Sequence, residues 1–501
     1  MPLRIATLLL LAAVAGAEGW PFGGGQGPFS ARDLWNLGLV GAKASDADKP
    51  PPANTPPSGR RQVRLEPGVG NEGPERLRIE LLYPGGPAEK AGLQTGDVVV
   101  GAGSKRFKEG SLEQLAKALL KAEASPKGEL TLLVERGGKG KAEKVVVTLP
   151  PGGREAGKPT EGKGRRALLD GALKWLADRQ QEDGGYVETL SGKNGAVVQA
   201  ALAGLAWLGA GSDLESGPYS ANVRLAAAWV GKNVRDLDGE IPGREPGGPS
   251  WNQSNWGVAH AAIFLGELHA RTPDRQVLDD LTWCAQRLVD TQEKSGGWAH
   301  GPGGKNALGY LELNIVTGLA LSGLGCAKRN GFAVPEDTLQ RAEAYLEASS
   351  GGGGVGYSDQ PGQKGSGNIG RTAGCWLGYQ ALGLGKAKFA KSMESFAKRE
   401  AGNVLGGHAS LMQHVLLAGV AAPALGSAAR KDFWESCEPS FVLARAPDGS
   451  FQPRPWHETI GMGSNSDVSF GEVWTTAAWA IVLASEKTKD GVVGYPVWTG
   501  E

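Results

Sequence analysis

The chain has 501 residues, with 53 lysines and arginines against 53 aspartates and glutamates. This balance gives no bias toward nucleic acid or an anionic membrane surface, and the length allows two or three domains. Residues 1–17 resemble a secretory signal: Arg4 gives a positive start, residues 5–14 are apolar, and residues 15–17 are small. We therefore expect a secreted or periplasmic protein without a membrane span.

Two stretches typical of linkers divide the rest of the chain. Residues 49–58 contain five prolines, and residues 150–164 are rich in glycine and lysine. They predict a Pro/Gly-rich segment, a first domain, a linker and a second domain, at residues 18–59, 60–150, 151–165 and 166–501.

The first domain reads as a small mixed α and β unit. Residues 77–83 alternate as a strand, a short helix follows the turn at residues 85–88, and residues 98–100 form an apolar strand. An amphipathic helix at residues 112–121 and two closing strands at residues 130–136 and 144–149 complete the predicted order.

This order has at its centre Gly-Gly-Pro-Ala-Glu-Lys-Ala-Gly-Leu-Gln-Thr-Gly-Asp-Val-Val, beginning at Gly85. It resembles the circularly permuted PDZ domains of bacterial exported proteases. The resemblance implies that a peptide or protein C-terminus binds as an added strand, with its carboxylate on the backbone N–H groups of a glycine-containing loop. The best loop candidate is Leu37-Gly38-Leu39, and residues 67–70 are the second. The alternative is a domain that serves as a spacer or docks within the chain.

From residue 165 onward the chain repeats one plan six times: an amphipathic helix, a glycine-rich turn and a small-residue apolar helix. In the first repeat, helical spacing is shown by Ala172, Trp175, Leu176 and Gln180. They lead into Asp183-Gly184-Gly185-Tyr186, where the glycines permit a positive φ that ends the helix. Comparable turns lie at residues 238–239, 296–298, 354–357, 406–408 and 448–451.

The second helix of each unit is apolar on nearly every side, which is typical of a buried helix. These six helices form the predicted inner layer, while the amphipathic helices before them form the outer layer. We predict a multidomain chain, with an α+β PDZ-like domain followed by an all-α (α/α)6 toroid. The inner helices are predicted at residues 197–209, 255–268, 313–326, 372–383, 410–425 and 473–485.

Residues 171–186 and 285–298 resemble the Gln/Trp repeats of the terpenoid cyclase and protein prenyltransferase toroids. The resemblance implies a scaffold. The acidic motifs Asp-x-Asp-Asp and Asp-Asp-x-x-Asp are absent from the sequence, so cyclisation is not expected. A PDZ domain before a toroid also resembles a family of exported bacterial proteins of unknown function.

The zinc-dependent prenyltransferases offer a further resemblance, because Gly370-Arg371, Cys375 and His408 follow their ligand pattern. The aspartate expected two residues before the cysteine is Ala373 here, and Asp467 is the substitute carboxylate. We predict no cofactor and read Cys375 as a small buried side chain. A zinc-dependent transferase is kept as an alternative.

Polar and aromatic residues recur where the inner helices begin, above apolar turns, as in a ligand pocket. Glu312 and Glu472 come from units three steps apart and are the predicted acid/base pair. Asp467 and His408 assist them, and Arg371 positions an anion. The predicted substrate-binding residues are Asn255, Trp256, His260, Tyr310 and Trp474.

Capping and core packing are the alternative roles for these residues. We therefore predict an exported protein that binds peptide or protein C-termini and carries a toroid with a pocket for a small molecule or glycan. A glycan-acting hydrolase or lyase that uses the carboxylates is the first alternative, and the zinc-dependent transferase is the second.

Overall fold

The computed structural model describes residues 34–48, 74–108, 110–150, 162–188, 192–239, 253–302, 312–365, 367–406, 410–453, 466–488 and 491–493. The chain divides into two compact units. The first comprises Met1–Lys158, Pro439–Pro447 and Gln452–Ser469, and the second comprises Pro159–Glu438, Asp448–Phe451 and Phe470–Glu501.

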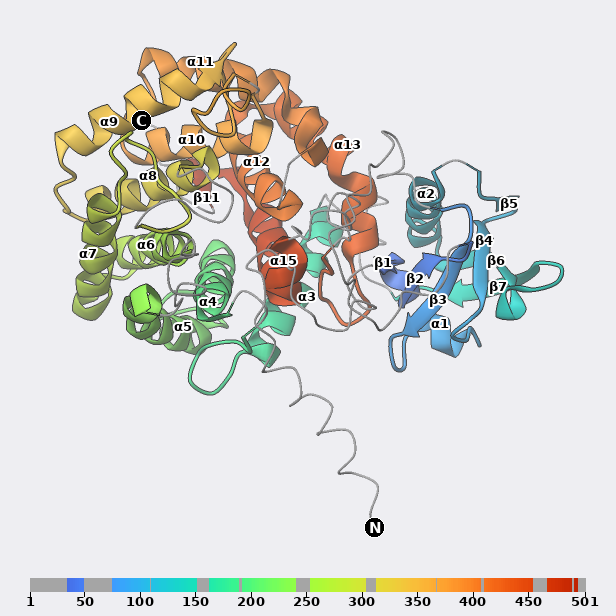
Figure 1. Cartoon of the computed structure of the whole chain (residues 1–501). Helices are drawn as coiled ribbons and strands as arrows, with labels where there is room; N and C mark the ends of the chain where they lie inside the picture. Colours follow the sequence, from blue (N-terminus) through green and yellow to red (C-terminus); the bar gives the residue numbers. More distant parts are fainter. Residues whose placement is uncertain are drawn as a thin grey trace, which may run out of the picture. The chain divides into compact units, whose positions relative to one another are not determined.

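The first unit is built on one antiparallel sheet (Figure 1). Its strand order is β1-β2-β3-β4-β6-β7, and β5 pairs with β4 beside this path. The strands are β1 (Trp35–Asn36), β2 (Ala42–Asp46), β3 (Leu77–Leu82), β4 (Val98–Ala102), β5 (Lys105–Arg106), β6 (Glu129–Glu135) and β7 (Glu143–Thr148).

Two α-helices and a tight loop complete this sheet. Helix α1 (Pro87–Lys90) follows β3, and α2 (Ser111–Glu123) contacts β4 and β6. The buried side chains of α2 include Leu112, Leu115 and Leu119, one face of an amphipathic helix. Between β1 and β2, the chain turns through the 3-10 segment η3 (Gly38–Val40).

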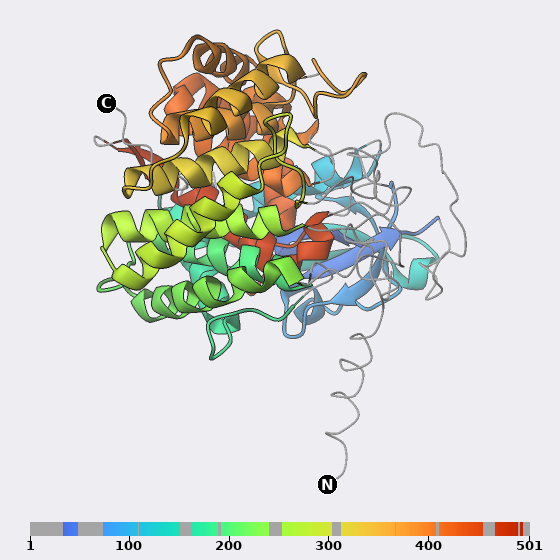
Figure 2. The ribbon, with the colours of Figure 1, turned by 60° about the vertical axis from the view of Figure 1, so that its left-hand side comes forward.

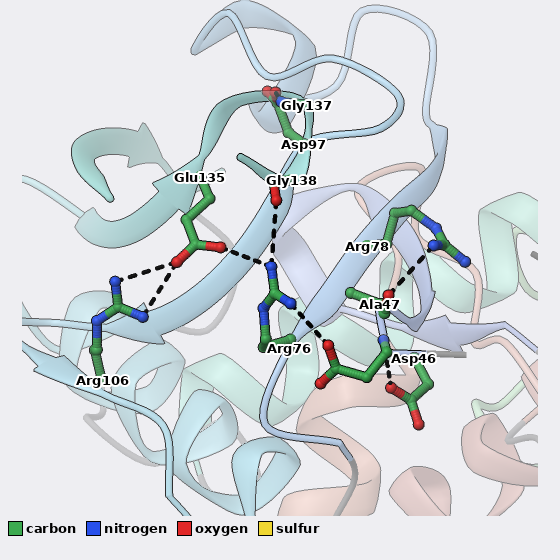
Figure 3. A network of polar contacts seen from close by, with 10 residues as sticks. Asp46, Ala47, Arg76, Arg78, Asp97, Arg106, Glu135, Gly137 and Gly138 are labelled. Atoms are coloured by element: carbon green, nitrogen blue, oxygen red, sulfur yellow. Dashed lines mark hydrogen bonds and ion pairs between the residues drawn. The ribbon is translucent and has the colours of Figure 1, made fainter. Parts of the chain in front are cut away.

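Ion pairs join the far end of β2 to the neighbouring strands (Figure 3). Arg76 Nη2 donates to Glu135 Oε2 at 2.8 Å, and Arg76 Nη1 donates to Asp48 Oδ1 at 2.7 Å. Arg106 bonds the other oxygen of Glu135 at 3.2 Å. Because the Glu135 carboxylate is 8% exposed, these partners compensate for its desolvation and fix β2 against the sheet.

The second unit contains six helix pairs among its described residues (Figure 1). The outer helices are α3 (Gly162–Arg179), α5 (Ser220–Asn233), α7 (Arg275–Asp290), α9 (Glu336–Ser349), α11 (Lys388–Arg399) and α13 (Ser427–Ala444). The inner helices are α4 (Gly192–Gly209), α6 (Ser254–Arg271), α8 (Asn314–Arg329), α10 (Ile369–Ala381), α12 (Leu411–Leu425) and α15 (Ser466–Ala484).

Contacts between neighbours join the inner helices in a closed ring, and Figure 2 gives the ribbon turned by 60° from the view of Figure 1. Helix α4 contacts α6, α6 contacts α8, α8 contacts α10, and α10 contacts α12. Val482 of α15 lies against Gly419 of α12, and Ala484 lies against Gly209 of α4. At the outer layer, Trp175 Nε1 of the first helix pair donates to Asp448 Oδ2 in the turn of the last helix pair, at 3.0 Å.

The glycine-rich turns repeat in atomic detail. Gln180 Nε2 donates to the carbonyl oxygens of Gly184 and Asn222, at 3.0 and 3.1 Å. Gln292 makes the same two bonds one repeat later, to Gly296 and Thr338, at 2.8 and 2.9 Å. In both turns the amide therefore ties a helix end to the next outer helix.

The aromatic that ends each of these turns also has an equivalent bond. Tyr186 Oη donates to Leu176 O at 2.9 Å, and Trp298 Nε1 donates to Leu288 O at 2.7 Å. In both repeats, the aromatic side chain closes the turn by bonding a carbonyl ten residues earlier in the sequence. This bond explains why an aromatic residue recurs at the same position of the turn.

The predicted fold class is confirmed, and the sheet also includes strands that precede residue 60. Strands β1 and β2 belong to the sheet, so the first unit begins before residue 60. Residues 439–447 and the described residues 452–453 and 466–469 also group with the sheet rather than with the toroid. Pro439 lies inside α13, whose last turns thus belong to the first unit.

Candidate functional sites

The toroid gathers four aromatic or imidazole side chains near the starts of its inner helices. Trp256 and His260 lie on α6, and Trp474 lies on α15. Trp256 stacks on His300 with ring centroids 5.9 Å apart, and His260 meets the edge of Trp474 at 6.1 Å. The structure therefore brings together three predicted substrate-binding residues, and it adds His300.

Hydrogen bonds define the tautomers of the two histidines. Trp256 Nε1 donates to His300 Nδ1 at 2.8 Å, so His300 carries its proton on Nε2. His260 Nδ1 lies 2.8 Å from the carbonyl oxygen of Trp256, so this nitrogen is the donor and Nε2 holds a lone pair. Desolvation lowers the pKa of His260 to about 4 and that of His300 to about 3. Both rings are neutral at pH 7.

The asparagines that begin α6 and α8 have equivalent partners. Asn255 Nδ2 donates to Ala299 O at 3.0 Å, and Asn314 Nδ2 donates to Gly356 O at 2.9 Å. Their backbone N–H groups bond the next carbonyls, those of His300 and Tyr357, each at 3.0 Å. Asn255, predicted to bind substrate, therefore ties an inner helix to a turn, and its buried Oδ1 has no hydrogen-bond partner among the described residues.

The two carboxylates predicted as an acid/base pair have different surroundings. Glu312 is 5% exposed and accepts from Ser295 Oγ at 2.5 Å. Glu472 is exposed. The carboxylate next to Glu312 is Glu293, whose pKa is raised by desolvation and by the charge of Glu312. Asp467 is buried and groups with the first unit.

Arg371 lies on α10 and is 7% exposed. Its Nε donates to Val355 O at 3.4 Å, and its guanidinium lies 5.5 Å from the ring centroid of Tyr357. Desolvation lowers its pKa to about 10, so it stays charged at pH 7. These contacts hold the side chain against the turn before α10, where it packs on an aromatic ring.

Of the residues predicted as possible zinc ligands, the structure describes Cys375 but not His408. Cys375 Sγ donates to Asn314 O at 3.5 Å, and burial raises the pKa of this thiol to about 12. A neutral thiol with a carbonyl partner matches a packing role. Within the described ranges, no group of three or more His, Cys, Asp and Glu residues is placed to hold a metal. His408, and likewise Tyr310 of the predicted substrate site, lie outside the described residues.

In the first unit, residues 36–40 form a buried turn directly before β2, which we call the glycine loop. Leu37 and Leu39 are 1% and 4% exposed, and Gly38 has φ +65°. Leu37 N donates to Ala42 O at 2.9 Å, which closes the loop. The predicted peptide-binding residues thus lie together at the start of a sheet strand.

The glycine loop contacts the chain's own residues 442–445. Asn36 Nδ2 donates to Leu443 O at 2.6 Å and to Arg445 O at 3.0 Å. A Cβ on Gly38 would lie 2.8 Å from Val442 O and 3.0 Å from Leu119 Cδ1. Only glycine allows so close an approach of a carbonyl to the loop.

Strand β1 pairs with the edge of β2 that lies opposite β3, with Trp35 beside Ala44 and Asn36 beside Lys43. Addition of a peptide as a strand along this edge, which the PDZ resemblance implies, would therefore require β1 to leave. Binding at the glycine loop itself does not need this rearrangement.

Sequence reasoning missed His300, Glu293 and the partners of Asn36. An alignment of the repeats could have pointed to His300 and Glu293. In it, Glu293 aligns with Gln181, and His300 comes two residues after Trp298, the aromatic residue of the turn. No local pattern links Asn36 to Leu443, since 407 residues separate them.

Solved structures with weak similarity to this chain include two glycan-acting enzymes and a terpene cyclase. A GH76A alpha-1,6-mannanase from Salegentibacter sp. HEL1_6 shares 11% identity over 64% of this chain and 98% of its own, with a TM-score of 0.44. An unsaturated glucuronyl hydrolase from Bacillus sp. GL1 shares 12% over 67% and 98%, with a TM-score of 0.40. The type II terpene cyclase MstE from Scytonema shares 14% over 64% and 97%, with a TM-score of 0.36.

No curated protein shows significant sequence similarity to the chain. In the part of the chain that the structure describes, no helix has both the length and the apolar character needed to cross a membrane. A PDZ domain model matches residues 78–136. A second model, described as a domain of unknown function (DUF6288), matches residues 167–487, more than half of the chain, which therefore belongs to that family.

Proposed function

We propose that this chain is an exported binding protein whose PDZ-like unit takes up a peptide or protein C-terminus at the glycine loop. The single observation that supports this most directly is the bonding of Asn36, which donates to two main-chain carbonyl oxygens next to Gly38. A carboxylate offers the same oxygen acceptors with more negative charge. Leu37, Leu39 and Leu119 favour an apolar last residue in the partner.

The test is binding of labelled peptides to the full chain, measured by fluorescence polarisation. The probes are decapeptides that end in Leu or Val with a free carboxylate, each with an amidated counterpart. We expect saturable binding of the free acids that is weakened at least about 10-fold by amidation, because the amide removes the charge. Equal binding of acid and amide, or no binding by the wild type and by the released variant described below, would refute the proposal.

Export is part of this proposal and rests on the signal-like residues 1–17. Expression of the full-length chain in a bacterium with an outer membrane should place the mature protein in the periplasm or medium. N-terminal sequencing is expected to start at Glu18. Recovery of the uncleaved chain from the cytoplasm would rule export out.

For the toroid, a glycan-acting hydrolase or lyase is the second candidate, and one observation favours it. The pKa of Glu293 is raised beside Glu312, and acid/base catalysis on glycans needs two carboxyl groups in different protonation states. Glu472 stays in the proposed set as an exposed carboxylate.

Polysaccharides and unsaturated oligosaccharides are suitable probes, with reducing-end release and ultraviolet absorbance as readouts. Turnover should fall at least about 100-fold in Glu312→Gln and in Glu293→Gln. The exposed variant Glu188→Gln serves as a control that keeps full turnover. Activity that survives both substitutions would dismiss this candidate.

A further inference from the structure

We infer that the C-terminal end of α13 is an internal ligand of the glycine loop, with which an external C-terminal carboxylate must compete. This inference rests on the proposed peptide-binding function and adds its regulation. Three carbonyl oxygens, those of Val442, Leu443 and Arg445, approach the loop at Asn36 and Gly38.

The chemistry of a helix end explains why it can replace a carboxylate. Helix α13 ends at Ala444. The last four carbonyls of a helix have no intrahelical donor and together carry a partial negative charge. Ala444 O receives a bond from Gln452 N at 2.7 Å, while Leu443 O receives the Asn36 amide. Asn36 therefore holds oxygen atoms that, like those of a carboxylate, accept hydrogen bonds and carry negative charge.

A buried ion pair fixes the segment beside the loop. Arg445 Nη1 donates to Glu123 Oε2 at 3.1 Å, and its Nη2 donates to the other oxygen. The two side chains are 1% and 2% exposed. Glu123 is the last residue of α2, whose Leu119 faces Gly38. Removal of one partner would leave a buried charge unpaired. The pair therefore holds Arg445, and with it the end of α13, beside α2.

The internal segment lowers the apparent affinity for any external peptide. A peptide binds only to the fraction of molecules in which the segment has left the loop, and the apparent Kd rises by the reciprocal of that fraction. A segment on the same chain acts at an effective concentration of about millimolar. If the open fraction is about 1–10%, peptide binding weakens by about 10-fold to 100-fold.

The released variant is Glu123→Gln/Arg445→Gln, which removes both charges and leaves neither unpaired. A matched control is Asp280→Asn/Arg235→Gln, which removes another pair, joined at 2.6 Å, within the toroid. We expect the released variant to bind the free-acid decapeptides at least about 10-fold more tightly than the wild type, and the control variant to match the wild type.

Hydrogen exchange of the wild-type chain supplies a measurement that needs no variant. Saturating free-acid peptide should increase amide exchange in residues 440–447, and the amidated peptide should not. Two results together would overturn the internal-ligand inference alone. The free-acid peptide would bind the wild type and the released variant with equal affinity, and exchange in residues 440–447 would not change. No binding by either protein would overturn the proposed function as well.

Discussion

The two buried histidines of the toroid should make its stability fall at mildly acidic pH. His260 is fully buried and His300 is 3% exposed, and desolvation lowers their pKa values to about 4 and about 3. An unfolded histidine has a pKa of about 6.5. Protons therefore bind the unfolded chain first, and the stabilisation is complete above about pH 6.5 and is lost as the pH falls toward the folded pKa values.

The size of the loss follows from these values. Between pH 6.5 and pH 5, each histidine is protonated in the unfolded chain and remains neutral in the folded one. Each pH unit then costs about 1.4 kcal/mol per group. Over 1.5 units, the pair accounts for about 4 kcal/mol of the free energy of unfolding. The loss continues below pH 5 and ends once the folded rings are protonated as well.

Urea denaturation followed by tryptophan fluorescence at pH 7.5 and pH 5 measures this effect. His260→Gln/His300→Gln should be less stable at pH 7.5, and its loss between the two pH values should be about 4 kcal/mol smaller than that of the wild type. Gly184→Ala is the control, since it weakens the same unit without changing a titratable group. If the histidine variant lost as much stability between the two pH values as the wild type, the buried neutral histidines could not be the cause.

Three further outcomes are expected. Gly184→Ala should lower the free energy of unfolding by at least about 2 kcal/mol, because φ is +98° and a Cβ would overlap Leu225 O. Gly192→Ala, at φ +59° and with open space around the added Cβ, should lower it less. Urea denaturation measures both values. Asp448→Ala should lower the Tm by several degrees, since it removes the Trp175 contact; an unchanged Tm would contradict this. Cys375 should react with a thiol reagent only after unfolding, and stoichiometric zinc in the purified protein would contradict its assignment as a packed thiol.

Most of the fold could be predicted because its signals are local. The apolar inner helices and the glycine turns between layers are both periodic in the sequence, and their spacing predicts a ring. The glycines of the inner helices leave room for a neighbouring helix. A Cβ on Gly318 would lie 2.9 Å from Cys375 N, and one on Gly378 would lie 2.8 Å from Leu321 Cβ. Such contacts allow α8 and α10 to pack closely.

The site residues were harder to assign because one type of side chain can serve several purposes. An asparagine at a helix start can cap, bind a ligand or, as with Asn255, bond a distant turn. Charged pairs such as Arg445 with Glu123 are separated by 322 residues and leave no local pattern. The burial of Glu312 and the exposure of Glu472 likewise depend on which way each side chain turns, which periodicity does not define.

The joint between the first and last helix pairs limits how this architecture can vary. In an open stack, another copy of a unit can be added at either end without disturbing the others. Here Asp448 bonds Trp175, and Ala484 packs on Gly209, so the last helix pair already contacts the first. An inserted pair would therefore change the contacts between all neighbouring pairs. Diversification is therefore expected in the lengths of the segments that join the helices, at a fixed number of pairs.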